Sequence, residues 1–78
     1  MLTVLRVGPY RFFFYSSDGS ELPHVHVERD RDTAKFWLSP VRLQKSGGFR
    51  RHELRRIQQI IDDHREALLR SWDEYFNR

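Results

Sequence analysis

Two histidines separated by one residue are the clearest chemical signal in the chain. His24 and His26 fall in the segment His24-Val25-His26-Val27-Glu28, which alternates strictly between polar and apolar residues. In a β-strand, residues i and i+2 lie about 6.5–7 Å apart on one face, so both imidazoles can reach the same ligand. Imidazole is a common metal ligand and the usual acid–base group near neutral pH. This strand face is therefore the first candidate for a functional site.

Three interpretations of the histidine pair stay open. In the first, the histidines form a half-buried polar face that is hydrogen-bonded to its neighbours. In the second, His24 and His26 are the catalytic acid and base of a metal-independent ribonuclease, and an arginine neutralises the phosphate charge; the candidates for that arginine are Arg11, Arg51 and Arg55. In the third, His24 and His26 are metal ligands, and folding supplies a further ligand. The candidates for that ligand are Asp18, Glu21, His52 and His64.

Positive charge is concentrated in one short stretch of the sequence. Residues 1–41 carry five basic and five acidic side chains, whereas residues 42–56 carry six basic side chains against one glutamate. Arginine binds phosphate in a bidentate manner and stacks on bases, and a basic patch attracts polyanions. We therefore expect RNA or another polyanion to bind at the start of a helix. The residues expected to bind it are Arg50, Arg51, Arg55 and Arg56.

Length and composition restrict the class of protein. The chain has 78 residues, which is one domain, with no cysteine and eleven aromatic residues to fill a small core. No apolar run approaches the roughly 20 residues needed to cross a bilayer, so no membrane association is expected. The N-terminus lacks the pattern of a signal peptide, so a cytoplasmic protein is expected. We expect no cofactor.

The first half of the chain predicts β-strands. The expected strands cover residues 2–7, 10–15, 24–28 and 33–38, with a short further strand over 41–44. The three consecutive phenylalanines 12–14 are expected in the core. Ser46-Gly47-Gly48 is expected to be the hinge that ends this half. A single domain over residues 1–78 follows, with a β half over 1–45 and a helical half over 49–77.

The second half predicts an amphipathic helix. An apolar stripe recurs at steps of three and four residues, through Leu54, Ile57, Ile61, His64, Leu68, Trp72 and Tyr75. The stripe fits one long helix, or two helices that break at Asp62-Asp63-His64, since aspartate can cap the second helix. The predicted fold class is α+β: an antiparallel sheet of three to four strands with the C-terminal helix, kinked or split, packed on one face.

Several segments resemble one bacterial protein family. They are Val7-Gly8-Pro9-Tyr10-Arg11-Phe12-Phe13-Phe14-Tyr15-Ser16, Pro23-His24-Val25-His26-Val27, Ala34-Lys35-Phe36-Trp37-Leu38, Gly48-Phe49, His52-Glu53-Leu54-Arg55-Arg56-Ile57 and Trp72. Together they make the whole chain similar to the domain of unknown function family 4160. The Pro-His-Val-His-Val segment after an Asp-Gly turn is the most specific of them.

The resemblance implies a genetic context and no catalytic residue. Such proteins are often encoded beside a second short gene, in pairs that are suspected toxin–antitoxin-type modules. We therefore expect a partner protein encoded nearby, and the exposed edges of a small sheet also allow a homodimer. Whether the chain is an enzyme stays open, with ribonuclease-like phosphodiester chemistry as the expectation if it is one. The alternatives are a non-enzymatic binding or assembly module, and a small metal-binding protein that uses His24 and His26.

Overall fold

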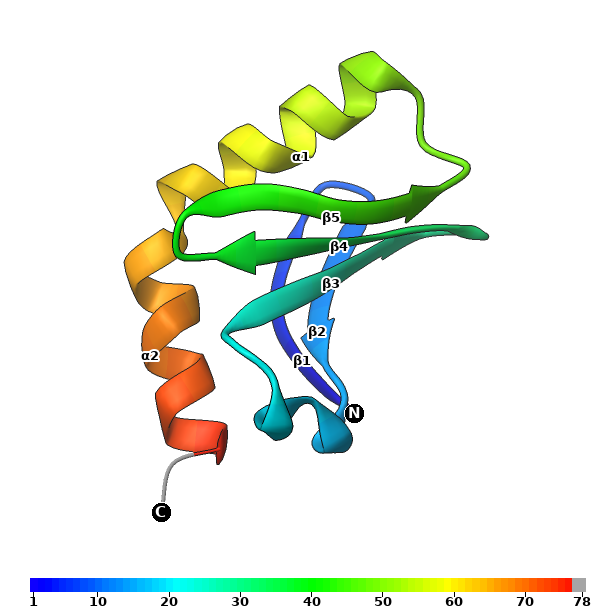
Figure 1. Cartoon of the computed structure of the whole chain (residues 1–78). Helices are drawn as coiled ribbons and strands as arrows, with labels where there is room; N and C mark the ends of the chain where they lie inside the picture. The colour runs from blue at the N-terminus through cyan, green and yellow to red at the C-terminus, as the bar shows by residue number, and fades with distance from the viewer. Residues whose placement is uncertain (77–78) are drawn as a thin grey trace.

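One antiparallel sheet and two helices make up the computed structural model, which describes residues 1–76 (Figure 1). The strands lie in chain order in the sheet: β1 (Leu2–Val7), β2 (Tyr10–Phe14), β3 (His24–Arg29), β4 (Asp32–Leu38) and β5 (Val41–Gly47). A short 3₁₀ helix, η1 (Ser16–Ser20), joins β2 to β3. The helices α1 (Arg51–Asp63) and α2 (Arg65–Phe76) follow the sheet. The predicted α+β class is confirmed.

The sheet has five strands rather than the predicted three to four. The last strand, expected over 41–44 only, continues to Gly47, so Ser46 and Gly47 belong to β5 and not to a hinge. Only Gly48 leaves the strand, with a backbone φ of 102°. The sequence underestimates β5 because its side chains are almost all exposed and show no apolar alternation; its hydrogen-bonded partner β4 defines it instead. Residue 77, the last of the predicted helical half, lies outside the described residues.

The core fills one face of the sheet. Phe12 and Phe14 from β2, Val25 and Val27 from β3, and Phe36 from β4 are completely buried. They alternate with residues of the opposite face, as the period of a strand requires. Ile57, Ile61, Leu68, Trp72 and Phe76 cover them from the helices. The expected burial of the phenylalanine run is confirmed.

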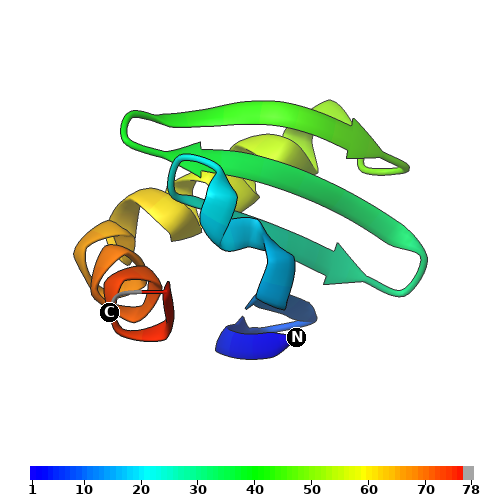
Figure 2. The same ribbon diagram turned by 60° about the horizontal axis from the view of Figure 1, so that its bottom comes forward.

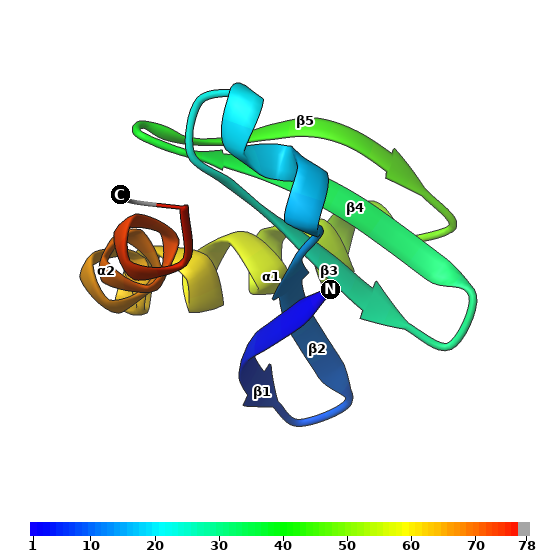
Figure 3. The same ribbon diagram turned by 90° about the horizontal axis from the view of Figure 1, so that it is seen from below.

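Two helices, rather than one, cover this core. The break falls at His64, whose ring Nδ1–H donates to the Ile60 carbonyl oxygen at 2.8 Å. Figure 3 shows α2 end-on while α1 runs across the view, so the chain turns sharply at this point. Of the two alternatives that the sequence leaves open, the split helix is the one observed. No helix within residues 1–76 has the length and apolar character needed to cross a membrane.

The other face of the sheet is free of α1 and α2 over most of its area. In Figure 1, α1 lies above the strands and η1 below them, and Figure 2 shows η1 in front of the sheet. The side chains on this open face include Phe13, His24, His26 and Lys35, which occupy the alternate positions of β2, β3 and β4. The histidine pair therefore lies where η1 covers the sheet.

Candidate metal centre

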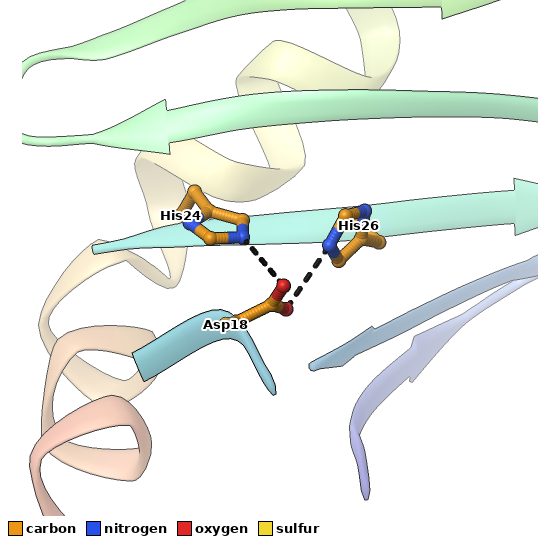
Figure 4. Close-up of side chains that lie close together, drawn as sticks. All are labelled: Asp18, His24 and His26. Atoms are coloured by element: carbon orange, nitrogen blue, oxygen red, sulfur yellow. Dashed lines mark hydrogen bonds and ion pairs between the residues drawn. The ribbon is translucent and has the colours of Figure 1, made fainter. Parts of the chain in front are cut away.

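Folding brings one carboxylate between the two histidines. The Asp18 Oδ1 atom lies 3.2 Å from His24 Nε2, and its Oδ2 atom lies 3.0 Å from His26 Nε2 (Figure 4). Within residues 1–76, these three residues are the only group of three or more His, Cys, Asp or Glu residues whose ligand atoms come close enough to share a metal ion; all lie within 4.8 Å of one another. We call Asp18, His24 and His26 the Asp–His–His cluster.

The 3₁₀ helix η1 fixes the position of Asp18. The Tyr15 backbone N–H donates to Asp18 Oδ2 at 2.8 Å, which ties the carboxylate to the turn that follows β2. Gly19 allows η1 to approach α2 closely, because a Cβ atom at this position would lie 2.7 Å from the Phe76 ring. The Asp18 carboxylate is therefore buried, and both of its oxygens point toward β3.

His24 has a defined tautomer and no exposed surface. Its Nδ1 lies 2.9 Å from the Leu22 carbonyl oxygen, which can only accept, so Nδ1 carries a proton and donates it. In a neutral ring, Nε2 then holds a lone pair, and that lone pair faces Asp18 Oδ1. The contact is close but lacks the alignment of a hydrogen bond, and Nε2 has no hydrogen-bond partner among the described residues. With a neutral His24, two acceptors therefore face each other in a buried site.

His26 lies at the edge of the same cluster and is partly accessible, with 17% of its side chain exposed. Its ring stacks on Phe13, with centroids 5.4 Å apart, and packs edge-on against Tyr15 at 4.7 Å. Burial lowers the pKa of His26, and the nearby Asp18 carboxylate partly opposes this effect. The neutral ring, the form that binds metals, is therefore favoured.

The structure brings one of the four candidates for a further ligand next to the two histidines. Asp18 joins the histidines, whereas the Glu21 carboxylate accepts a hydrogen bond from Lys35 at 2.6 Å. His52 is exposed on α1, and His64 is bonded to the helix backbone. In the sequence, Asp18 is marked by its position in a turn directly before the strand that carries the two histidines. Its spacing from them does not distinguish it from the other three candidates.

The four arginines expected to bind polyanions form a separate surface. Arg50, Arg51, Arg55 and Arg56 are all exposed at the start of α1, and none of them forms an ion pair with another residue in the described part of the chain. Because α1 packs on the core face of the sheet, the structure does not bring these arginines together with the Asp–His–His cluster. Arg11 is also engaged elsewhere, in an ion pair with Glu28 at 2.8 Å.

The comparisons with known proteins identify a family and no close relative. No curated protein and no solved structure matches the chain significantly. A family model described as "Domain of unknown function (DUF4160)" matches residues 10–73, a range that contains all three members of the Asp–His–His cluster. The match covers most of the chain and agrees with the resemblance seen in the sequence. The chain therefore belongs to the domain of unknown function family DUF4160.

Proposed function

We propose that this protein binds a divalent transition-metal ion through Asp18, His24 and His26. The observation that carries the proposal is the buried His24 Nε2 atom, which lies 3.2 Å from a carboxylate oxygen and has no hydrogen-bond partner among the described residues. A cation between the two atoms turns this repulsive contact into two bonds. Two imidazoles and one carboxylate suit Zn²⁺ and related divalent metals.

The hydrogen bond on the far side of His24 supports a ligand role. Metal-binding histidines usually donate their second ring N–H to a carbonyl or carboxylate, which fixes the tautomer and the direction of the lone pair. The bond from His24 Nδ1–H to the Leu22 carbonyl has this arrangement. The alternative is a protonated His24 paired with Asp18. That alternative requires a fully buried imidazolium whose Nε2–H is poorly aligned with its only nearby acceptor.

Three protein ligands leave room for a small molecule on the metal. Sites of this kind are typical of catalytic zinc, where water or substrate occupies the fourth position and the metal lowers the pKa of the bound water. The open position would face the side of His26, since His24 has no exposed surface. For the same reason His24 cannot touch a substrate directly, which favours a metal-ligand role over a two-histidine ribonuclease mechanism.

A zinc titration tests the metal site. Metal-free protein is titrated with Zn²⁺ in competition with a chromophoric chelator, for the wild type, for Asp18→Asn and His26→Gln, and for His52→Gln as the control. We expect one zinc ion per chain, and a loss of affinity of at least about 10–100-fold in the two site variants, since even outer-shell changes cost that much. His52→Gln should bind as the wild type does. Absence of zinc binding by the wild type, or an equal loss in the control, contradicts the proposal.

We also propose the wider role implied by the family resemblance, in a bacterial two-gene toxin–antitoxin-type module. The exposed arginines of α1 support binding to RNA, and the strands β1 and β5, which lie at the two edges of the sheet, support binding to a partner protein or to a second copy of the chain. The test is induced expression of the chain in a bacterial host, alone and together with the neighbouring gene. Growth arrest that the neighbour relieves supports the role of toxin, and unaffected growth in every arm contradicts it.

A further inference from the structure

A row of four side chains crosses the open face of the sheet. Strand register pairs Phe13 with His26, His26 with Lys35, and Lys35 with Lys45, so the row runs from β2 to β5. Neighbouring strands lie about 4.8 Å apart, so a phenylalanine, a histidine and two lysines stand side by side on adjacent strands. We call these four residues the lysine row. A cavity of about 350 Å³ lies along it.

The charges in the lysine row are unbalanced. Like charges directly opposite each other on antiparallel strands are destabilising, and Lys35 and Lys45 stand in this relation. Glu21 neutralises Lys35, which also lies over the Trp37 ring at 5.0 Å. Lys45 is exposed and forms no ion pair with any other described residue. An anion in the cavity would bind to Lys45 and screen it from Lys35.

The remaining walls of the cavity are suited to a nucleotide. Thr33 lines it, on the same face of β4 as Lys35, and carries a hydroxyl group that can donate a hydrogen bond to a phosphate oxygen. Tyr15 also lines it and is 43% exposed, so its ring is available for stacking, whereas Phe13 is buried beneath. Aromatic rings next to basic groups are the usual platform for single-stranded nucleic acid.

We propose that this cavity binds the phosphate group of a nucleotide, either free or within single-stranded RNA, beside Lys35 and Lys45, with the base against Tyr15. The inference goes beyond the metal site and stands without it, because neither the lysines nor Thr33 belongs to the Asp–His–His cluster. His26 belongs to both sites, so a bound metal would lie at the wall of the phosphate site. The α1 helix packs on the opposite face of the sheet, and none of the basic residues at its start lines this cavity.

The test is an NMR titration of ¹⁵N-labelled protein in the presence of a chelator. The probes are adenosine 5′-monophosphate, adenosine without phosphate, and a short single-stranded RNA. The test variant is Lys45→Gln. The control is Arg42→Gln, which removes a charge from the same strand at a position that does not line the cavity. We expect the nucleotide to shift the amide signals of residues 33–35 and 45–47. Lys45→Gln should weaken its binding about 10-fold, the usual value of one charge-assisted contact, while Arg42→Gln and adenosine alone show little effect.

Each outcome separates this inference from its alternatives. If RNA binds with the same dependence on Lys45 and the free nucleotide does not, the ligand is the phosphate backbone of RNA and the inference stands. If neither binds, or if RNA binding is lost in Arg55→Gln and unchanged in Lys45→Gln, the inference is overturned. Binding that requires added zinc would also overturn it, because the metal would then be the phosphate ligand. Binding in chelator by a protein that takes up no zinc contradicts the metal proposal alone.

Discussion

The two ends of β3 carry two polar clusters that differ in how their buried polar atoms are paired. His24 begins the strand within the Asp–His–His cluster, and Arg29 ends it within a second cluster formed by Tyr10, Arg29, Asp32 and Glu53, here called the Arg29 cluster. Arg29 lies 3.0 Å from Glu53 and 3.1 Å from Asp32, and the Tyr10 hydroxyl donates to Glu53 at 3.1 Å. Each carboxylate of the Arg29 cluster therefore meets a donor.

The two clusters differ in which of their buried atoms lacks a hydrogen-bond partner. The Arg29 cluster joins β2, β3, β4 and α1, and its one unpartnered atom, Arg29 Nε, is a donor on a guanidinium whose other nitrogens are bonded. In the Asp–His–His cluster the unpartnered atom is His24 Nε2, which in a neutral ring is an acceptor that faces a second acceptor, Asp18 Oδ1. Within the described residues the Arg29 cluster is complete, whereas under our proposal a cation completes the Asp–His–His cluster. Substitutions in the two clusters should therefore affect different properties.

Removing Glu53 should have the largest effect on stability. In Glu53→Ala, Arg29 and Tyr10 lose their common acceptor, and breaking a buried ion pair costs about 3–5 kcal/mol. We expect about 3 kcal/mol, the lower end, because a third of the Arg29 side chain is exposed. Urea denaturation measures this loss. Zinc affinity should not change, and a loss below about 1 kcal/mol would show that the Arg29 cluster does not hold α1 on the sheet.

Zinc should stabilise the folded chain by a comparable amount. A ligand that binds only the folded state at 100 times its Kd adds about 2.7 kcal/mol to the free energy of unfolding. We expect this increment in the wild type and in Glu53→Ala, and an increment smaller by about 1.3 kcal/mol or more in His26→Gln, whose zinc affinity should be at least about 10-fold lower. Urea denaturation with and without zinc checks it. If zinc raises the free energy of unfolding of His26→Gln as much as that of the wild type, the ion binds somewhere else.

Removing one hydroxyl from the Arg29 cluster should have a smaller effect. Tyr10→Phe deletes the donor to Glu53 and should cost about 1 kcal/mol near neutral pH. Burial, and then the hydrogen bond to Glu53, raises the pKa of Tyr10 above its usual value of 10.0. The folded state therefore holds this proton more tightly than the unfolded state, and the stability this provides is complete below pH 10 and lost as pH rises through the folded-state pKa.

The stability difference between the wild type and Tyr10→Phe should consequently shrink above pH 10, as measured by urea denaturation at a series of pH values. A difference that stays constant or grows over the same range would show that Tyr10 does not keep its proton in the folded state.

The sequence predicted the elements that its apolar pattern encodes. Alternation in His24–Glu28 predicted a strand with the valines in the core, and the stripe from Leu54 to Tyr75 predicted the helical half and its optional break. Local pattern suffices here because burial repeats with the period of the element. The full length of β5 was not predictable, since its exposed side chains carry no such period.

The candidate sites depend on contacts between segments that are far apart in the sequence. The sequence alone therefore predicts only some of their residues. His24 and His26 were found because they lie two residues apart on one strand. Asp18 was one of four candidates, and its selection depends on the packing of Gly19 against Phe76 at the far end of the chain. Glu53 was counted as the lone acid in a basic stretch, but folding buries it against Arg29 and Tyr10. Lys35 and Lys45 become neighbours only through the register of β4 and β5.

The smallest predicted change tests the central claim most directly. In Asp18→Asn, the amide oxygen can still accept from the Tyr15 N–H and from His26, while the amide N–H₂ replaces the oxygen that faces the His24 lone pair. If His24 is neutral, this substitution removes a repulsive contact and should leave the free energy of unfolding, measured in chelator, within about 0.5 kcal/mol of the wild type or above it.

The deciding measurement is urea denaturation of the wild type and Asp18→Asn, each with chelator and with saturating zinc. We predict equal or greater stability of Asp18→Asn in chelator, and a clearly larger stabilisation by zinc in the wild type than in Asp18→Asn at the same zinc concentration. A loss of about 3 kcal/mol in Asp18→Asn with chelator, with no zinc effect on either protein, would show that a protonated His24 is paired with Asp18 and that the cluster is structural.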